Sequence, residues 1–387
     1  MLSVMLSGIF KMKNKIKFIF FISLLGTLVF TRFYGLNWGF PYTFHPDENN
    51  MAGALLRLSC SLTNITECLN PHFYAYGQLQ LYLAGSIFSF VSRFIVPYSE
   101  FLVGTLSLRI ISSAASIMTG LVLSKLIHTK TSSYILTSLF LLLYTFTPGF
   151  IQQAHFGTTE SLLTLFLVLI VYFDKRVLIQ AILVGLAAAT KPSGILFGVF
   201  PLYFLIARGL GEKTSPLRDS IIIVAIVGIV TLLFSPHYLL HFKDFWQTFL
   251  YESALARGSI EVFYTEQFRN TIPMAFQLTK IFPYALGLPV SLISLFGLVQ
   301  SIPLLSLFLY FSFLYVKWTR FIVPISVLML YFGFLGLHKK TSITFITVIT
   351  VITVLYQIFI GTRFMNLYTQ KDVRITASEW INKNLPQ

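Results

Sequence analysis

Long apolar runs recur along almost the whole chain and restrict the folds that are open to it. Runs such as 102–123, 321–337 and 343–360 match the roughly 17–25 residues that a helix needs to cross about 30 Å of hydrocarbon. Only helices and closed barrels satisfy their backbone hydrogen bonds in lipid, and continuous rather than alternating apolar runs indicate helices. The sequence therefore predicts an all-α, polytopic membrane protein with about eleven transmembrane helices.

The composition also indicates a membrane protein and argues against a soluble domain and against a nucleic-acid-binding protein. Of the 387 residues, 56% are hydrophobic and 11% are charged, whereas a soluble domain usually has roughly a quarter of its residues charged. The net charge of +14 comes from basic residues in short loops at the expected cytoplasmic ends of the spans, as the positive-inside rule requires. Because no basic stripe alternates with base-stacking aromatic residues, we expect no nucleic-acid partner.

The first span sets the expected orientation of the chain. Residues 1–17 contain four lysines and precede the apolar run 18–33, and no small-x-small cleavage site follows that run. We therefore expect residues 1–17 to be a cytoplasmic N-terminus and the first span to stay uncleaved.

Residues 34–100 are then expected to lie largely outside the cytoplasm. Within them, 49–58 and 78–94 have apolar faces and are predicted to form helices along the membrane interface. If 78–94 crossed the membrane instead, the later topology would be inverted, but the distribution of basic residues argues against this. Cys60 and Cys68 lie in the same loop, where a local disulfide and two free thiols are both open.

The remaining spans are predicted from apolar length and from the basic loops between them. They cover about 102–123, 134–146, 161–173, two short segments around Lys191, 221–234, 286–299, 303–316, 321–337 and 343–360, with loop 208–219 inside and the aromatic-rich loop 236–284 outside. We divide the chain into the cytoplasmic residues 1–17, a transmembrane domain over 18–361, and residues 362–387, which we expect to begin a truncated extracytoplasmic region.

Two acidic turns are predicted on the same outer face of the membrane. In the first, Pro46 favours a helix start, so Asp47 and Glu48 fall in a first helical turn that stabilises anionic side chains. The second contains His155 and Glu160. Helix capping alone would explain the carboxylates, and His155 alone would suit an interfacial histidine. Together, however, such groups on one face suit general acid–base chemistry or cation binding.

Two cations are predicted within the membrane domain. Arg109 lies about two turns inside the span 102–123, and Lys191 lies between the two short segments. Charged residues at such depth are costly unless they are paired. An internal salt bridge to one of the acidic residues above and the binding of an anionic group, such as a lipid phosphate, are both open.

The order of these motifs resembles the GT-C superfamily of polytopic membrane glycosyltransferases, particularly its protein O-mannosyltransferase and aminoarabinose-transferase branch, which includes the dolichyl-phosphate-mannose-protein mannosyltransferases. The matching segments are Phe44-His45-Pro46-Asp47-Glu48, Asn70-Pro71-His72-Phe73-Tyr74-Ala75-Tyr76-Gly77, Arg109, Ala154-His155-Phe156-Gly157-Thr158-Thr159-Glu160 and Ala189-Thr190-Lys191-Pro192, with looser matches over Tyr251–Gly287 and Thr319–Pro324.

The resemblance implies a GT-C type fold in a cell-membrane protein and an inverting transfer of a sugar from a polyprenyl-phosphate donor. The acceptor would be a hydroxyl of a protein, lipid or glycan at the extracytoplasmic face. The implied catalytic residues are Asp47 as general base and Glu48 in support, and the implied substrate-binding residues are His45, Arg109, His155, Glu160 and Lys191, with Arg109 and Lys191 at the donor phosphate. Some members need a divalent cation, and the sequence leaves such a cofactor and its metal ligands open.

A membrane transporter or lipid flippase is the main alternative. That class places ionisable residues near mid-membrane in repeated halves, whereas no internal repeat is evident here and most carboxylates fall in the outer turns. A membrane scaffold is a third alternative, but it gives no reason for two acidic turns on one face. The sequence therefore favours a membrane glycosyltransferase.

Overall fold

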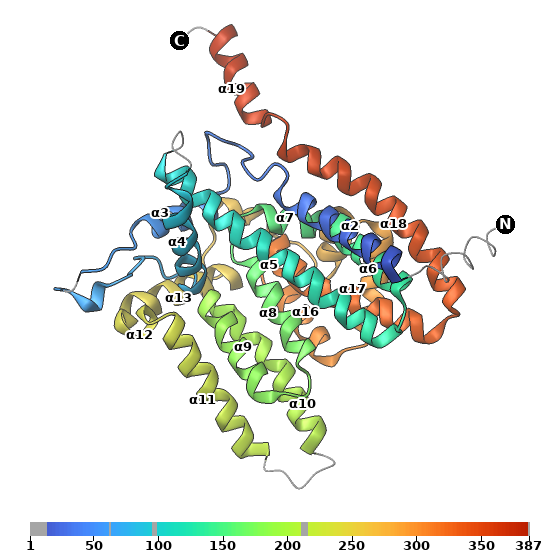
Figure 1. The fold of residues 1–387 in the computed structure, drawn as a ribbon. Coiled ribbons are helices and arrows are strands. Elements are labelled where there is room, and N and C mark those ends of the chain that lie inside the picture. The colour runs from blue at the N-terminus through green and yellow to red at the C-terminus, as the bar shows by residue number, and fades with distance from the viewer. Residues whose placement is uncertain (1–13, 62, 95–98, 210–215, 386–387) are drawn as a thin grey trace.

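The computed structural model describes residues 14–61, 63–94, 99–209 and 216–385, and these residues form a helical assembly (Figure 1). Most of the predicted cytoplasmic segment 1–17 lies outside the described residues, as does the centre of loop 208–219. The described residues contain no strand apart from one isolated bridge between Ser61 and Asn64. The all-α prediction is confirmed.

The α-helices share apolar sequences and follow one another through short connections. In chain order they are α2 (Asn14–Phe33), α3 (Pro46–Leu56), α4 (Leu79–Val91), α5 (Glu100–Thr131), α6 (Tyr134–Phe146), α7 (Pro148–His155), α8 (Glu160–Tyr172), α9 (Val177–Thr190), α10 (Val199–Gly209), α11 (Pro216–Phe234), α12 (His237–Leu240), α13 (Phe242–Arg257), α14 (Phe282–Ala285), α15 (Leu288–Leu298), α16 (Ile302–Phe313), α17 (Thr319–Lys340), α18 (Ile343–Met365) and α19 (Val373–Asn384). Short 3₁₀ or π turns join them at Ile65–Glu67, Pro192–Gly198, Phe263–Phe268, Gln277–Ile281 and Asn366–Tyr368.

Most of these helices coincide with the predicted ones. The predicted break around Lys191 is present, because α9 ends at Thr190 and Pro192 opens a 3₁₀ turn. The helices α7, α12, α13 and α14 were not predicted. α7 occupies the expected outer turn, where Pro148 begins a new helix bent by 60° from α6. α13 occupies part of the expected loop 236–284.

The described helices differ in their ability to cross a membrane. Three are long and apolar enough, namely Glu100–Thr131, Thr319–Lys340 and Ile343–Tyr368, or up to five if each of two bent helix pairs is one span. Shorter apolar helices lie at Ile19–Phe33, Leu79–Val91, Glu160–Tyr172, Val177–Thr190 and Pro192–Ala207. The chain is a helical membrane protein, and the count of about eleven spans stays a prediction.

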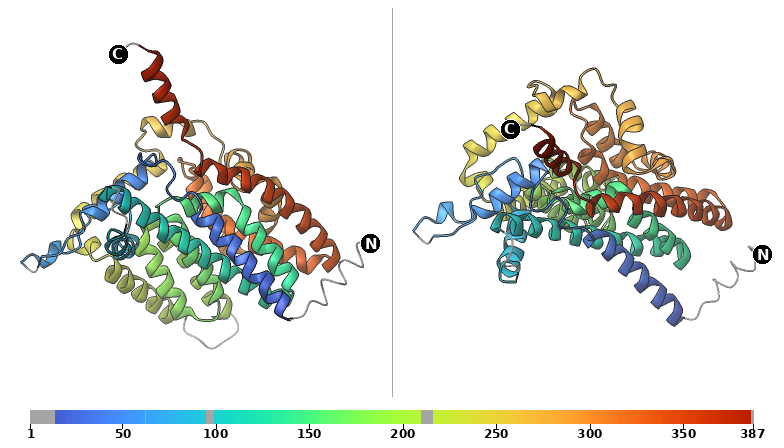
Figure 2. Two further views of the ribbon diagram at one scale, coloured as in Figure 1. Left: turned by 45° about the horizontal axis from the view of Figure 1, so that its top comes forward. Right: turned by 90° about the horizontal axis from the view of Figure 1, so that it is seen from above.

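The helix α5 is the centre of the assembly. It packs against α3, α4, α6 and α8, while α17 packs against α15 and α16 (Figures 1 and 2). The outer faces keep large apolar side chains exposed, such as Val224, Leu233 and Leu355. Apolar atoms exposed along whole helices suit contact with lipid rather than water. The last helix, α19, projects away from the body and has no buried residue (Figure 2).

A small separate core positions the first acidic turn. Met51 and Leu55 of α3 pack with Leu81 of α4 and Leu108 of α5, and all four side chains are buried. Because this core holds α3 against the outer part of α5, it places Asp47 and Glu48, at the start of α3, next to α5.

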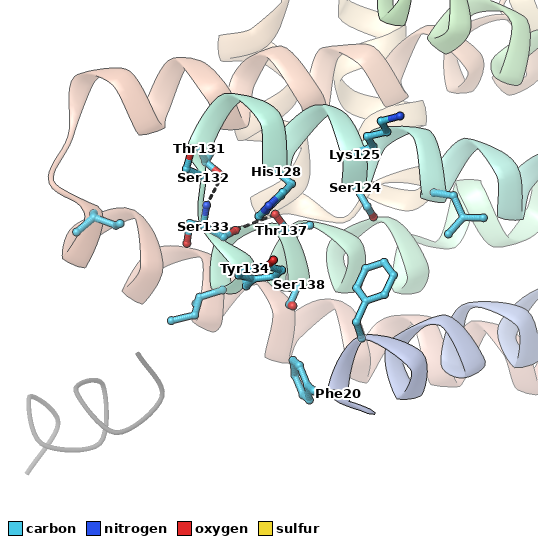
Figure 3. A pocket seen from close by; sticks show the side chains of 14 residues that line it. Phe20, Ser124, Lys125, His128, Thr131, Ser132, Ser133, Tyr134, Thr137 and Ser138 are labelled. Atoms are coloured by element: carbon cyan, nitrogen blue, oxygen red, sulfur yellow. Dashed lines mark hydrogen bonds between the residues drawn. The ribbon is translucent and has the colours of Figure 1, made fainter. Parts of the chain in front are cut away.

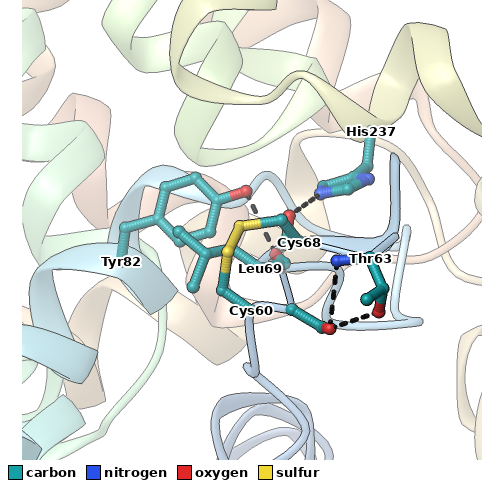
Figure 4. The surroundings of a disulfide bond; sticks show 7 residues. Cys60, Thr63, Cys68, Leu69, Tyr82 and His237 are labelled. Carbon is teal, nitrogen blue, oxygen red and sulfur yellow. Dashed lines mark hydrogen bonds between the residues drawn. A yellow bond between two sulfur atoms is a disulfide. The ribbon is translucent and has the colours of Figure 1, made fainter. Parts of the chain in front are cut away.

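The loop between α3 and α4 contains both cysteines of the chain, and they form the disulfide Cys60–Cys68 (Figure 4). The alternative of two free thiols is therefore excluded. Next to the disulfide, the carbonyl oxygen of Cys68 lies 3.0 Å from Nε2 of His237 in α12, and the Tyr82 hydroxyl donates to the carbonyl of Leu69 over 3.2 Å. The disulfide loop is therefore tied both to α4 and to the segment that follows α11.

Candidate active site

The two neighbouring carboxylates of α3 point to different partners. His45 is the N-cap residue in extended conformation, and Pro46 occupies the first helical turn, as the sequence predicted. Successive residues of a helix are about 100° apart around its axis. Glu48 is accordingly fully buried against α5, whereas Asp47 is only partly buried and reaches α17.

Glu48 forms a two-pronged ion pair with Arg109. Nε and Nη2 of Arg109 each donate to one carboxylate oxygen over 2.8 Å, and the backbone N–H of Gly157 donates to Oε1 over 2.6 Å. A Cβ at Gly157 would lie 2.8 Å from Cβ of Leu108, so the close approach requires glycine. The second acidic turn is thus bound to the first through a buried carboxylate.

Both donors on Nη1 of Arg109 are also occupied. Nη1 donates to the carbonyls of Leu36 over 2.8 Å and of Trp38 over 3.0 Å, and the guanidinium lies 4.4 Å from the Trp38 ring centre. Both Arg109 and Glu48 are inaccessible to solvent. Of the two alternatives that the sequence left open for Arg109, the structure forms the internal salt bridge.

Asp47 pairs with a residue that sequence reasoning did not select, Arg320 at the start of α17. Nη1 of Arg320 donates to the Asp47 carboxylate and also to the Tyr76 hydroxyl, the latter over 3.3 Å. The guanidinium lies 4.3 Å from the centre of the Trp318 ring. The only sequence signal for Arg320 was its place in a segment that loosely matches the GT-C superfamily.

Glu160 pairs with Lys191. Nζ of Lys191 lies 3.0 Å from Oε1 of Glu160, and both side chains are largely buried. The break between α9 and the following 3₁₀ turn places Lys191 here, because its extended backbone turns the side chain away from the helix axis. The ammonium also lies 5.0 Å from the centre of the Tyr76 ring.

Tyr76 lies between the two cations because its loop approaches α9 very closely. The N–H of Gly77 donates to the carbonyl of Thr190 over 2.9 Å. A Cβ on Gly77 would come within 1.9 Å of the Ala189 carbonyl oxygen, so no other residue fits without moving the backbone.

The two ion pairs meet at one small pocket. Glu160, Lys191 and Arg320 line it together with the apolar side chains of Phe197, Phe311, Phe321 and Pro324, among others. Its volume of about 20 Å³ has room for little more than one water molecule. One carboxylate and two cations from distant parts of the chain therefore line a space where water is scarce, and Asp47 is joined to it through Arg320.

Glu252 of α13 is a further acidic residue near this cluster, and no local pattern singled it out. Its side chain is exposed at the surface, yet partial removal from water raises the pKa of the carboxyl above its ordinary value, against the opposing effect of Arg320 and Lys191.

The two histidines predicted for the site lie apart from the pocket. His155 is buried, stacks on Tyr368 at 4.0 Å between ring centres, and has each ring nitrogen 2.9 Å from a carbonyl oxygen, of Ile151 and of Tyr34. The ring of His45 packs against Phe156 at 4.5 Å, and its Nδ1 is buried without a partner in the described part of the chain.

No group of three or more His, Cys, Asp or Glu side chains suited to a metal ion occurs among the described residues. The charges of the pocket are balanced by Arg and Lys. The pocket thus contains a carboxylate paired with a cation, together with a second cation whose carboxylate partner is Asp47.

Comparison with known proteins identifies the fold. No protein-family model and no curated protein sequence matches the chain. Among solved structures, the aminoarabinose transferase ArnT of Cupriavidus metallidurans is similar in its apo state, with a TM-score of 0.53 and 15% identity over 83% of this chain and 60% of that one. The same protein bound to undecaprenyl phosphate gives a TM-score of 0.54 and 15% identity over 85% and 61%.

An oligosaccharyltransferase of Archaeoglobus fulgidus is similar as well, with a TM-score of 0.50 and 12% identity over 97% of this chain and 59% of that one. The chain thus spans about 60% of the length of the solved structures that it matches.

Proposed function

The chain has the fold of the GT-C membrane glycosyltransferases, and from this premise we propose that it transfers a sugar from a polyprenyl-phosphate donor to a hydroxyl acceptor. The observation that carries the proposal is the convergence of Asp47–Arg320 and Glu160–Lys191 at one pocket. Such a site offers a base for a hydroxyl and cations for a phosphate. The similar structure that contains undecaprenyl phosphate supports a polyprenyl-linked donor.

In this proposal Arg320 and Lys191 hold the donor phosphate. Each cation now has a carboxylate partner, and a phosphate that enters the pocket would replace the carboxylate as the partner of the cation. Arg320 would then release Asp47 for the acceptor. This assigns to Arg320 the phosphate role that the sequence had suggested for Arg109, whose fully buried guanidinium already donates four hydrogen bonds within the chain.

Asp47 then acts as the general base. It takes the proton of the acceptor hydroxyl, the hydroxyl oxygen bonds to the anomeric carbon, and the bond from that carbon to the phosphate oxygen breaks. The leaving phosphate keeps the electron pair and is stabilised by the two cations. Direct attack opposite the leaving group inverts the anomeric carbon.

The other predicted site residues support this arrangement. Glu48 and Arg109 join α3 to α5 and to the second acidic turn, and so orient the helix that carries Asp47. His155 fixes the contact between α7 and the end of α2. Glu160 orients Lys191, and His45 packs against Phe156 of the second acidic turn and caps the helix that carries Asp47.

We place the reaction at the extracytoplasmic face, because the basic loops lie at the other end of the helices. The mannosyltransferase branch named by the sequence motifs makes a polyprenyl-phosphate mannose the first donor to assay, and a protein hydroxyl the first acceptor. A requirement for a divalent cation is tested by adding a chelator to the same assay.

The test is an assay of membranes that contain the chain with a panel of polyprenyl-phosphate sugars, with mass spectrometry of the products. The proposal expects a mass gain of one sugar on an acceptor together with release of the polyprenyl phosphate. The control is membranes without the chain. If these membranes consume every donor of the panel as fast as membranes that contain the chain, the proposal is rejected.

A further inference from the structure

A second pocket, of about 480 Å³, lies at the C-terminal end of α5 (Figure 3). It is formed by α2, α5, α6 and the first residue of α18. The helix α5 contributes to both regions, because it carries Arg109, which pairs with Glu48 beside the candidate active site, and His128, which lines the second pocket. At about 1.5 Å per residue the stretch from Arg109 to His128 is about 28 Å long, close to the ~30 Å thickness of the hydrocarbon layer. The two pockets therefore face opposite leaflets.

One wall of this pocket is apolar and open to the surroundings. Phe20 and Phe21 of α2 line it, and so do Leu121 of α5 and Ile343 of α18. Phe20 is 46% exposed and Ile343 is 43% exposed, and neither has a partner surface in the described chain that would cover it. In a bilayer this wall faces acyl chains.

The other wall is polar and contains two groups that suit an anion. Lys125 and His128 are contributed by the last turns of α5, among hydroxyl side chains such as Ser132 and Ser138. Nδ1 of His128 is buried and lacks a hydrogen-bond partner in the described residues. Lys125 is exposed at the rim, where its ammonium lies 5.2 Å from the Tyr172 ring centre, and its long chain can turn inward.

Helix ends add to this preference for negative charge. Ile135, in the first turn of α6, lines the pocket, and first-turn N–H groups of a helix have no acceptor within it. The last turn of α17 carries His338, Lys339 and Lys340, only a few residues before Ile343. The polar wall thus carries the positive charge of Lys125, and further basic residues lie close to Ile343 in the sequence.

We propose that this pocket binds an anionic phospholipid of the leaflet opposite the candidate active site. The lipid phosphate contacts Lys125, His128 and the first turn of α6, and an acyl chain lies along Phe20 and Phe21. The site needs both parts of such a molecule, because the charged wall alone would take a free phosphate and the apolar wall alone would take any lipid. This inference does not depend on glycosyl transfer.

The test compares phosphatidylglycerol with phosphatidylcholine. The purified chain is extracted from nanodiscs that contain equal amounts of both lipids, and the retained lipid is counted by native mass spectrometry. We expect one phosphatidylglycerol molecule to be retained in preference to phosphatidylcholine, and inorganic phosphate to leave it in place. Equal retention of the two lipids, or displacement by inorganic phosphate, would overturn the proposal.

A matched pair of variants on α5 locates the bound lipid. Lys125→Ala should lower the preference for phosphatidylglycerol about fivefold, the effect of one cation at a membrane surface. Lys130→Ala removes the same charge from an exposed position outside the pocket and should leave the preference unchanged. Lys125→Gln, which removes the charge but keeps a long polar side chain, should behave as Lys125→Ala does and guards against a folding defect. Equal effects at positions 125 and 130 would show a diffuse charge effect and reject the site.

Discussion

Asp47 and Arg320 are 273 residues apart in the sequence and form a salt bridge at the edge of the candidate active site. Both side chains are partly exposed, unlike those of Glu48 and Arg109, which are fully buried. The first pair can therefore exchange its partners for a substrate at lower cost than the second. This difference between two neighbouring carboxylates separates a proposed base from a structural residue.

The role of Arg320 in donor binding is tested by Arg320→Ala. Loss of a charge-assisted contact to phosphate should weaken the binding of a polyprenyl-phosphate sugar about 10–100-fold, as measured by the dissociation constant of the purified protein. Arg320→Lys should recover part of the affinity, since it keeps the charge but not the fork of donors. Arg363→Ala, an exposed arginine of α18, is the control. Unchanged donor affinity in Arg320→Ala would remove Arg320 from the phosphate site.

The Glu48–Arg109 pair should act on stability. Arg109→Ala leaves a buried carboxylate without its partner, which should cost about 3–5 kcal/mol of folding free energy and lower the unfolding temperature in detergent clearly. The exposed pair Arg269–Glu261 offers a matched comparison. Arg269→Ala should cost at most about 1 kcal/mol, so similar losses of thermal stability in the two variants would contradict the structural role.

A pH effect is expected in the disulfide loop. Hydrogen bonding from Asn70, with smaller effects of the nearby histidines, lowers the pKa of Glu67 from its ordinary 4.5. A carboxyl whose pKa is lower in the folded chain stabilises the fold above its unfolded pKa, and this contribution is lost as the pH falls through the folded pKa. Wild type should therefore exceed Glu67→Gln in thermal stability near pH 7, and the difference should shrink as the pH falls below 4.5 and vanish only below the lowered pKa of the folded chain. A difference that grows on acidification would contradict this account.

The proposed sidedness is tested with single added cysteines. The two native cysteines are joined in a disulfide, so an introduced thiol is the only free one. A cysteine at Gln267, which is exposed between α13 and α14, should react with an impermeant thiol reagent added outside intact cells. A cysteine at Lys339, at the end of α17, should react only after the cells are opened. The reverse pattern would invert the topology.

Local patterns in the sequence were enough to predict most helices. Apolar length predicted α6 and the body of α18, and the shortness of the two apolar segments around Lys191 predicted the break after α9. α13 was missed because its aromatic and charged residues alternate without a long apolar run. Such a helix is stabilised by its surroundings, which no local pattern describes.

The pairing of the charged residues was beyond the sequence. The sequence indicated that Arg109 and Lys191 needed acidic partners, and it contained the acidic residues that could be those partners. Which acidic residue pairs with which cation depends on packing. Glu48 turns toward α5 because the small core around Met51 fixes the rotation of α3. The same rotation leaves Asp47 facing α17, so Arg320 could be found only once α3 and α17 were placed side by side.

The central claim, that Asp47 is the base of a glycosyl transfer, is tested most directly by the transfer rate of Asp47→Asn. The purified variant should fold and bind polyprenyl-phosphate sugar, while its transfer rate falls at least about 10²–10⁴-fold, the usual contribution of a general base. Asp244→Asn, an exposed carboxylate of α13, should retain the wild-type rate. A transfer rate of Asp47→Asn equal to that of Asp244→Asn would contradict the account.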